Sequence, residues 1–393
     1  MSDKTTKGII KIMITKMTDK ELMDHYMLNA INGLGKRKIH ALLQEYKSAS
    51  DILSISDKEA DKIFGPKTAE SFKYAKSHWD KEKEYNKMLD LGIRIIPYDD
   101  ESFPNKLRTI PDPPSCIYVK GKLPDDNLPS VSIVGARMCS EYGRYVARQF
   151  GLELAQAGIQ IISGMAMGVD GISQKAALRS GHPSYGVLGC SPEFCYPDTN
   201  QDIYDMLCQN GGIISEYMPG TMPQARLFPQ RNRIISGLSD IVLVIEARKK
   251  SGTQITVDMA LEQGKEIFAV PGRITDRLSD GCNDLIRQGA GIALAPEDII
   301  SCFTGPIQES GICEHTGSSK SSESNVRYQS LSPLEKSVLD AMDIYPISAS
   351  EIAEKLEKDN IKEPVSVILH TLTMMQISGL IENQGSYYIK KIK

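Results

Sequence analysis

The hydrophobic and polar positions in the first part of the chain repeat with the period of an α-helix. Apolar residues stand three or four positions apart in residues 22–31 and again in residues 39–46, and Gly33-Leu-Gly35 separates the two runs. The pattern predicts a small helical domain over residues 19–90. Its glycine turn, followed by three basic residues, is similar to helix-hairpin-helix (SAM-like) segments, in which such a turn contacts a phosphate. A plain turn between helices is the alternative.

The middle of the chain follows a different pattern, in which short apolar runs alternate with helical segments. It begins after an extended, proline-rich connector. The apolar runs that we expect to be strands include residues 131–134, 159–162, 184–188 and 241–245. Each run leads into a glycine-bearing loop and then a helical pattern, which is typical of βαβ units. We therefore predict an α/β fold in which residues 91–303 form the connector and a Rossmann-like, doubly wound, mostly parallel sheet.

Serine, glycine, threonine and charged residues dominate residues 304–330, which we expect to be a flexible linker. Beyond it, three helical patterns and a hairpin turn at Asn383-Gln-Gly385 predict a winged helix over residues 331–393. A regulator that reads duplex DNA is one interpretation of this domain. Its third helix offers only Lys362 and His370 as cations, whereas duplex readers need several contacts, so a protein-contact module is the other interpretation.

Length and composition limit the class of protein. A chain of 393 residues with 41% hydrophobic and 24% charged residues is typical of a globular protein with two or three domains. No apolar run approaches the roughly 18 residues of a membrane span, and Lys11 interrupts the apolar N-terminal stretch, so we expect a cytoplasmic protein without membrane contact. The eight cysteines form no Cys-x-x-Cys pair, and Cys313 and His315 have no further metal ligands beside them. We expect reduced thiols and no bound metal.

Two glycine-bearing loops follow the first two strands that we expect in the middle of the chain. Gly135-Ala-Arg137 precedes one helix, and Ser163-Gly164, continuing to Gly168, precedes the next. Neither loop is Gly-x-Gly-x-x-Gly, and the chain has no Gly-x-x-x-x-Gly-Lys-Ser/Thr sequence, so we expect no nucleotide cofactor. Taken alone, each loop could be a tight turn that glycine permits.

Basic residues are placed selectively rather than abundantly. The chain has a net charge of −4, and residues 131–300 hold 15 Lys and Arg against 18 Asp and Glu. Several cations nevertheless come directly after strands, namely Arg137, Lys250 with its two basic neighbours, and Arg273. Because ligands bind beyond the carboxyl ends of the strands in an open parallel sheet, this placement predicts a local anion-binding edge.

Two helix starts contribute to the same edge. Phe228 is followed by Arg231-Asn232-Arg233, which places an aromatic ring that could stack on a base beside two guanidinium groups. Ser251-Gly252-Thr253 opens the next helix with hydroxyl groups and main-chain N–H groups, both of which are ligands for phosphate. Together these residues predict a site for a phosphate backbone.

Six motifs in this order and spacing resemble the DNA-processing protein A (DprA, Smf) family. They are Gly135 to Gly143, Ser163 to Asp170, Phe228 to Arg233, Ser251 to Thr253, Ala269 to Gly272 and Ser279 to Asn283. The resemblance implies a non-enzymatic, cytoplasmic protein that binds incoming single-stranded DNA during natural transformation, protects it and loads the recombinase RecA on it. It also implies a homodimer formed through the sheet domain, phosphate contact by Arg137 and base stacking by Phe228. The loop from Ser163 to Gly168 and the residues from Arg231 to Arg233 would line the pocket.

The chain departs from this family where other members often carry cations. Met167 and Ala225 replace basic residues, although Arg226 beside Ala225 is a substitute, and Asp198 follows Tyr-Pro in place of a cation. Gln174 stands where a histidine is common. Each lost phosphate contact removes roughly 0.7 from the salt slope of single-strand binding, so we expect weaker and less salt-sensitive binding than in such a relative.

An enzyme is the competing interpretation of the same residues. Ser251-Gly-Thr253 near Arg231 resembles the phosphate loop of nucleoside-monophosphate phosphoribohydrolases, which share this type of sheet. That loop is followed by a glutamate that the reaction requires, and here Thr256 stands in its place. No Ser-His-Asp or Cys-His set is evident either. We therefore expect no catalytic residue.

Overall fold

The structure of the protein is a computed structural model that describes residues 16–304, 332–342, 347–358, 361, 363–378, 380–384 and 387–390. The chain divides into two compact units, residues 1–305 and 306–393. Nearly all of the expected linker, with Cys313 and His315, lies outside the described residues, as do Lys11, Lys362 and Gly385. No helix in the described part of the chain is long and apolar enough to cross a bilayer.

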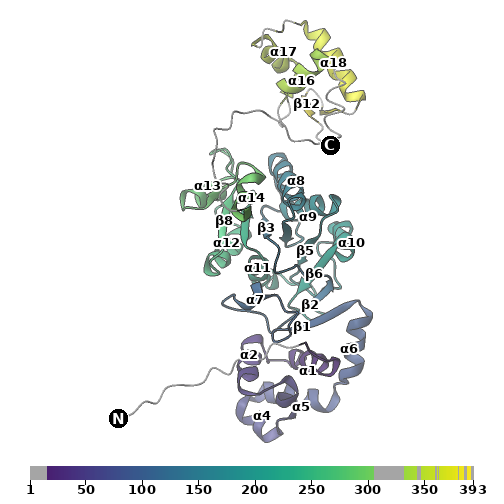
Figure 1. Cartoon of the computed structure of the whole chain (residues 1–393), viewed down its shortest axis with the longest axis vertical. Coiled ribbons are helices and arrows are strands. Elements are labelled where there is room, and N and C mark those ends of the chain that lie inside the picture. Colours follow the sequence, from purple (N-terminus) through teal and green to yellow (C-terminus); the bar gives the residue numbers. More distant parts are fainter. Residues whose placement is uncertain are drawn as a thin grey trace, which may run out of the picture. The chain divides into compact units, whose positions relative to one another are not determined.

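A nine-stranded sheet forms the centre of the first unit (Figure 1). Its strands are β1 (Ile93–Pro97), β2 (Cys116–Gly121), β3 (Ser130–Val134), β4 (Gln160–Ser163), β5 (Ser184–Val187), β6 (Gly211–Ser215), β7 (Ile241–Val244), β8 (Glu266–Ala269) and β9 (Gly291–Ile292). Their order is β1-β2-β6-β5-β4-β3-β7-β8-β9. In this spatial order, every pair of neighbouring strands from β6 through β5, β4, β3, β7 and β8 to β9 is parallel. This confirms the mostly parallel sheet that the sequence predicts.

Helices cover both faces of this sheet, as in a doubly wound fold. On one face, α8 (Glu141–Gln156), α9 (Val169–Arg179), α10 (Gln201–Gln209) and α14 (Pro296–Thr304) enclose two apolar clusters. On the other face, α7 (Asn105–Arg108), α11 (Leu227–Gly237), α12 (Gly252–Glu262) and α13 (Asp280–Arg287) enclose another. Successive side chains of the central strands point to opposite faces of the sheet. Ile133 packs in a cluster on the first face, and Val134 packs in the cluster on the second face. Because both faces of the sheet are covered, these strands consist of short continuous runs of apolar residues.

The connector was predicted to be merely extended, but it contributes strands to the sheet. β1 and β2 pair antiparallel with each other, and β2 pairs antiparallel with β6. The helical segment packs against this added edge, because Tyr26 and Met88 share an apolar cluster with Ile93 and Tyr118. The six helices are α1 (Asp19–Ala30), α2 (Lys36–Glu45), α3 (Ala49–Ser54), α4 (Asp57–Ile63), α5 (Pro66–His78) and α6 (Lys81–Asp90). This segment therefore belongs to the first compact unit.

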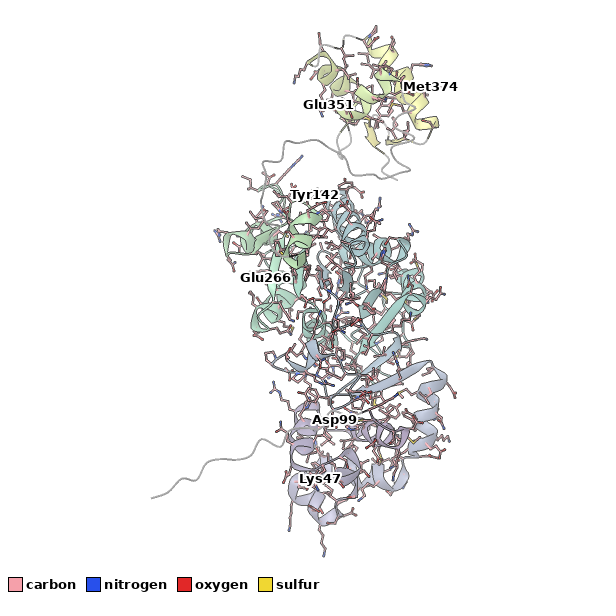
Figure 2. All side chains as sticks on the ribbon, viewed as in Figure 1. Lys47, Asp99, Tyr142, Glu266, Glu351 and Met374 are labelled. Carbon is pink, nitrogen blue, oxygen red and sulfur yellow. The ribbon has the colours of Figure 1, made fainter. Side chains whose placement is uncertain are left out.

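The described residues of the second unit form three helices and a small antiparallel sheet. Its elements are α16 (Pro333–Ala341), β10 (Ile347–Ser348), α17 (Ala349–Lys358), α18 (Val365–Ile377), β11 (Ile381–Gln384) and β12 (Tyr387–Lys390). Strands β11 and β12 form the expected hairpin. The assignment of this unit as a winged helix stays a prediction. Helix α18 contains no Lys, Arg, Asp or Glu, and apolar side chains such as Met374 are exposed on it (Figure 2).

Candidate nucleic-acid interface

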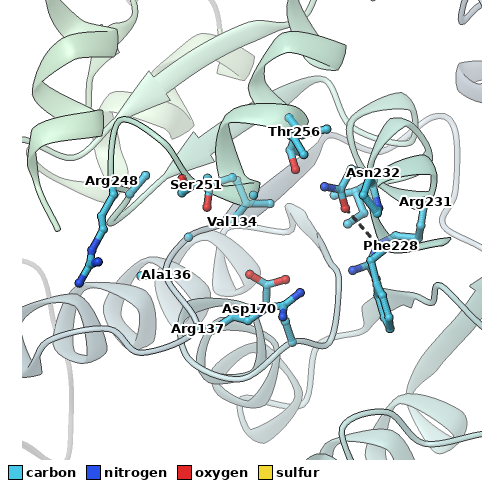
Figure 3. Close-up of a pocket in the computed structure, with 18 of the residues that line it drawn as sticks. Val134, Ala136, Arg137, Asp170, Phe228, Arg231, Asn232, Arg248, Ser251 and Thr256 are labelled. Atoms are coloured by element: carbon cyan, nitrogen blue, oxygen red, sulfur yellow. Dashed lines mark hydrogen bonds between the residues drawn. The ribbon is translucent and has the colours of Figure 1, made fainter. Parts of the chain in front are cut away.

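A pocket of about 670 Å³ opens at the carboxyl ends of β3 and β7 (Figure 3). The chain order reverses here, because β3 is followed on one side by β4 and has β7 on its other side. Open α/β sheets bind their ligands at such a switch point. Three arginines and one aspartate among the lining residues give the pocket a net charge of +2, in a chain whose net charge is −4. The positive charge is therefore local, as the sequence predicts.

One end of the pocket suits a phosphate. Arg137, which follows β3, and Arg248, which follows β7, both line it and are exposed. Helix α12 begins between them with Ser251 as its N-cap, and no side-chain hydrogen bond caps the helix. A Cβ placed on Gly252 would meet nothing within 4 Å, so the first turn is open to the pocket. The main-chain N–H groups of this turn and the positive end of the helix dipole both favour an anion.

The Ser251 hydroxyl oxygen is buried and has no hydrogen-bond partner among the described residues. A buried hydroxyl without a partner costs about 1 to 3 kcal/mol. Ser251 lies at the start of a helix that no side chain caps. An oxygen atom of a bound ligand would supply the hydrogen-bond partner that its hydroxyl group lacks.

The opposite end of the pocket is aromatic, and the Arg231 guanidinium borders it. Tyr196, which follows β5, and Phe228, at the start of α11, lie there with ring centroids 5.1 Å apart. Pro223, Ala225 and Pro229 also line the pocket. Figure 3 shows the separation, with Arg248 and Ser251 on one side and Phe228 and Arg231 on the other. The pocket thus offers a polar end for a phosphate and an aromatic end for a base.

Arg231 lines the pocket, but its guanidinium group is hydrogen-bonded to main-chain carbonyl oxygens of the protein. The residue is buried, and its Nη1 donates to the carbonyl oxygens of Gly164, at 2.8 Å, and Val187. Its Nε donates to Asn232 Oδ1 at 3.2 Å. Burial lowers the pKa of Arg231 to about 10, against the opposing effect of Asp170. The expectation that Arg231 offers its guanidinium group to a phosphate therefore needs correction, because main-chain carbonyl oxygens already accept from its Nη1.

Arg233 was expected to line the pocket, and this expectation was wrong. Arg233 is buried elsewhere, where it donates to Glu216 and lies 3.4 Å from Asp112. Lys36, at the start of α2, is 2.6 Å from the same Asp112 carboxylate. Successive helical residues point about 100° apart, so Arg231 and Arg233 cannot serve one site equally. The ion pairs also engage Lys36, one of the cations of the suggested helix-hairpin-helix segment.

Asp170 is the only carboxylic acid among the described residues that line the pocket. It accepts a hydrogen bond from the Gly164 N–H at 3.1 Å. Burial raises the pKa of Asp170, although Arg231 and the hydrogen bonds around the carboxylate act in the opposite direction. Asp170 therefore holds the second glycine loop in place and puts a buried acid beside the expected phosphate site.

The two glycine loops lie side by side, as expected. The Val169 N–H donates to the Ala136 carbonyl oxygen at 3.2 Å. Gly168 has a φ of 76°, and a Cβ there would lie 2.3 Å from that oxygen, so a side chain is excluded. Gln174, a departure from the family, is fully buried and accepts from the Met165 N–H at 3.1 Å. It therefore has a structural role under the second loop.

The structure brings together eight of the expected site residues as pocket lining. They are Gly135, Arg137, Phe228, Arg231, Asn232, Ser251, Gly252 and Thr253. Ser163, Gly164 and Gly168 support the pocket from the adjoining loop. Arg226, Lys250 and Arg273 are exposed but lie outside the lining, as does the buried Arg233. Arg248 is one of the cations that the sequence places at this edge, whereas Tyr196 and Asp170 were not predicted as site residues, although Asp170 ends one of the six motifs.

Comparisons with known proteins identify relatives of this chain. Residues 94–304 match the DNA recombination-mediator protein A family. The chain is 40% identical over 212 residues to the DNA processing protein DprA of Bacillus subtilis (strain 168), which covers 53% of this chain and 70% of the relative. It is 36% identical over 221 residues to DprA of Streptococcus pneumoniae, covering 56% of this chain and 76% of the relative. The X-ray structure of DprA from Streptococcus pneumoniae aligns with a TM-score of 0.62 and 31% identity, covering 73% and 98% of the two chains.

Proposed function

Because the chain belongs to the DNA recombination-mediator protein A family, we propose that its pocket binds single-stranded DNA without catalysing a reaction on it. The backbone phosphate lies at the polar end, against Arg137, Arg248 and the first turn of α12. An unpaired base lies at the aromatic end. The observation that carries this proposal is the division of one cavity into a cationic end and an aromatic end.

The same division favours a single strand over a duplex. Base pairs in a duplex are stacked inside the helix, so an aromatic wall inside a pocket is accessible only to an unpaired base. The net acidic chain also disfavours general adhesion to duplex phosphates. A few phosphate contacts combined with stacking give sequence-tolerant binding of a single strand.

Binding can be tested by fluorescence anisotropy with labelled oligo-dT and with a duplex of equal length. We expect tighter binding of oligo-dT, and loss of about one charge-assisted contact, roughly tenfold in affinity, in Arg137→Ala. Arg148→Ala is the matched control, because Arg148 is exposed on α8 and lies outside the pocket lining. Equal affinity for the duplex, or equal losses in the two variants, would refute the proposal.

We further propose that the protein acts in natural transformation, where it delivers the bound strand to the recombinase RecA. The family's role as a recombination mediator supports this step. RecA filament assembly on DNA coated with single-strand-binding protein is the direct assay. We expect the wild type to accelerate filament assembly and Arg137→Ala to accelerate it much less.

A homodimer formed through the sheet domain is the proposed assembly. It is supported by the sheet edge at β9, where Ile292 and Leu294 are 50% and 76% exposed. Exposed apolar side chains on an edge strand favour association with another chain. Sedimentation equilibrium should give a dimer, and Leu294→Lys should shift it toward the monomer.

A phosphoribohydrolase is the alternative function. The pocket is large enough for a nucleotide, and Asp170 is the single carboxylic acid among its described lining residues. The reaction would release adenine from AMP. We expect no adenine above the buffer blank, in the wild type and in Asp170→Asn alike. Turnover that disappears in Asp170→Asn would replace the binding proposal with an enzyme.

The second unit has a separate proposed role in contacting protein. Its α18 carries no Lys or Arg with which to bind phosphates. Truncation of residues 331–393 should therefore leave oligo-dT affinity within about twofold of wild type, because single-strand contacts lie in the first unit. A large loss of affinity would assign DNA contacts to the second unit.

A further inference from the structure

The exposed methionines of the first unit lie in the pocket or beside it. Met138 lines the pocket and is 81% exposed. Met167 and Met222 are 44% and 57% exposed, and each is next in sequence to a lining residue, Ala166 and Pro223 respectively. The other methionines that the structure describes in this unit are buried or half-buried. We call these three residues the rim methionines.

We propose that the rim methionines are an oxidation site, at which conversion of the thioethers to sulfoxides reversibly weakens the binding of DNA. This inference rests on the proposed binding of single-stranded DNA and adds a chemical modification that regulates it. Methionine oxidation turns an apolar side chain into a polar one and disrupts surfaces that are rich in methionine. Three such side chains at one pocket therefore make DNA binding sensitive to oxidants.

The main chain on both sides of Met138 is fixed, which keeps its side chain at the pocket. The Ser140 N–H donates to Glu246 Oε2 at 2.8 Å, and the Ser140 hydroxyl donates to the same carboxylate. A Cβ on Gly168 would lie 2.5 Å from the Arg137 carbonyl oxygen, so the loop that carries the second rim methionine packs directly on the main chain next to Met138. The two methionines therefore belong to adjoining, ordered loops.

The thiols of the protein compete poorly for an oxidant. Peroxides attack the thiolate form of cysteine, so a raised pKa protects a thiol at neutral pH. Burial raises the pKa of every thiol among the described residues, namely Cys116, Cys139, Cys190, Cys195, Cys208, Cys282 and Cys302. A thioether needs no ionisation to react. The rim methionines are therefore the sulfur atoms that combine exposure with reactivity at neutral pH.

The reaction with hydrogen peroxide is a transfer of one oxygen atom. A lone pair of the thioether sulfur attacks one peroxide oxygen, and the S–O bond forms as the O–O bond breaks. The proton of the transferred oxygen passes to the departing hydroxide, which leaves as water. Sulfur loses a pair of electrons and peroxide gains it. Methionine sulfoxide reductase, with a thiol as its reductant, reverses this change.

The sulfoxide oxygen interferes with phosphate binding because it is a hydrogen-bond acceptor beside the cations of the pocket. Met138 follows Arg137 in sequence, and both residues line the pocket and are exposed. A guanidinium group that donates to the sulfoxide has one donor fewer for a phosphate. The loss of one such hydrogen bond lowers affinity by about fivefold. Exposed side chains have room for the added oxygen atom, so the fold is preserved.

The test measures oligo-dT affinity by anisotropy before and after treatment with hydrogen peroxide, while mass spectrometry quantifies the oxidation of each methionine. The test variant combines Met138→Leu, Met167→Leu and Met222→Leu. Met374→Leu is the matched control, because Met374 is a 49% exposed methionine in the second unit. Treatment should weaken binding about fivefold or more in wild type and in Met374→Leu, and less than about twofold in the triple variant.

Reductants distinguish the methionines from the thiols. Dithiothreitol alone reduces disulfides and sulfenic acids, and it should leave the loss of affinity in place. Methionine sulfoxide reductase with dithiothreitol should restore binding. Recovery with dithiothreitol alone would assign the effect to cysteine and overturn the inference, as would an equal loss in the triple variant.

The outcomes separate this inference from the proposed function. If untreated wild type does not bind oligo-dT, the proposed function fails. If it binds, and its affinity is unchanged once the rim methionines are oxidised, only the oxidation site fails. The rate of oxidation gives a second readout on the unaltered protein. Bound oligo-dT should slow the oxidation of Met138 and leave that of Met374 unchanged, and equal rates at Met138 with and without DNA would contradict the inference.

Discussion

Arg231 Nη1 donates a hydrogen bond to the main-chain carbonyl oxygen of Gly164 across 2.8 Å. This bond joins helix α11 to the glycine loop that follows β4. A Cβ on Gly164 would lie 2.8 Å from Arg231 Nη2 and equally close to Asp170 Oδ2, so the three residues pack as one unit. The cation is therefore part of the scaffold that shapes the pocket.

Arg231→Ala should destabilise the first unit by about 3 kcal/mol, because it leaves buried carbonyl oxygens without a donor and Asp170 without its nearby cation. Urea unfolding followed through Trp79, the single tryptophan, measures this loss in the first unit. Arg226→Ala removes an exposed arginine at the N-cap of the same helix and should change stability by less than about 0.5 kcal/mol. Equal stability of the two variants would contradict the structural role of Arg231.

Ser251→Ala should separate ligand binding from helix capping. The buried hydroxyl oxygen has no partner among the described residues, so its removal should leave the free energy of unfolding unchanged or slightly higher. Affinity for oligo-dT should fall, by about tenfold if a charge-assisted hydrogen bond to phosphate is lost. A loss of about 1 kcal/mol in stability with unchanged affinity would identify the hydroxyl as an ordinary helix cap.

Oligo-dT affinity should depend on pH through Asp170, whose pKa burial raises. The charged carboxylate repels phosphate, so affinity should be highest below the raised pKa and should fall as the pH rises through it. The folded state also binds this proton more tightly than the unfolded state, so the associated stability is present in acid and is lost over the same rise.

Anisotropy titrations that start at the ordinary carboxyl pKa, about pH 4, and run upward check this dependence, since no histidine is among the described lining residues. Asp170→Asn should flatten the profile. Asp198→Asn, which removes a charge from an exposed position outside the lining, should keep it. A flat wild-type profile, or equal profiles in both variants, would exclude Asp170 as the titrating group.

Ala225→Lys should add a phosphate contact, because other members of the family often carry a basic residue at this position. Ala225 is exposed and lines the pocket, so a lysine there can reach a bound strand. One added contact should raise the salt slope by about 0.7 and the affinity by roughly fourfold at about 0.15 M salt. Leu89→Lys adds the same charge at an exposed position on α6, outside the lining, and should have a smaller effect. Identical slopes in the two variants would indicate general charge attraction.

Much of the fold could be predicted from local patterns. Continuous apolar runs such as residues 241–245 indicate strands buried on both faces, and the six motifs indicate the family to which the chain belongs. The antiparallel strands β1 and β2 could not be predicted, because the proline-rich connector carries no clear alternation, and their pairing with β6 is a contact between distant segments. The helices of residues 19–90 likewise gain their place through tertiary packing on that edge.

The candidate site was predictable in position and less so in detail. Arg137 comes shortly after β3 and Ser251 begins the helix after β7, so the topology alone places them at the sheet edge. Arg231 and Arg233 lie within a helix, where the sequence does not indicate which side chain faces a neighbouring carbonyl and which faces a carboxylate. Tyr196 belongs to a long loop whose course depends on the Asn200 contacts. Such positions depend on side-chain packing that no local pattern encodes.

Amide hydrogen exchange, with and without oligo-dT, tests the central claim most directly, because it locates the bound strand on the chain. We expect DNA to slow exchange in residues 136–138 and in residues 251–253, which line the pocket. Arg137→Ala at the same DNA concentration should show less protection in both segments. Slower exchange elsewhere on the chain, with both segments unchanged while DNA is bound, would contradict the proposed site.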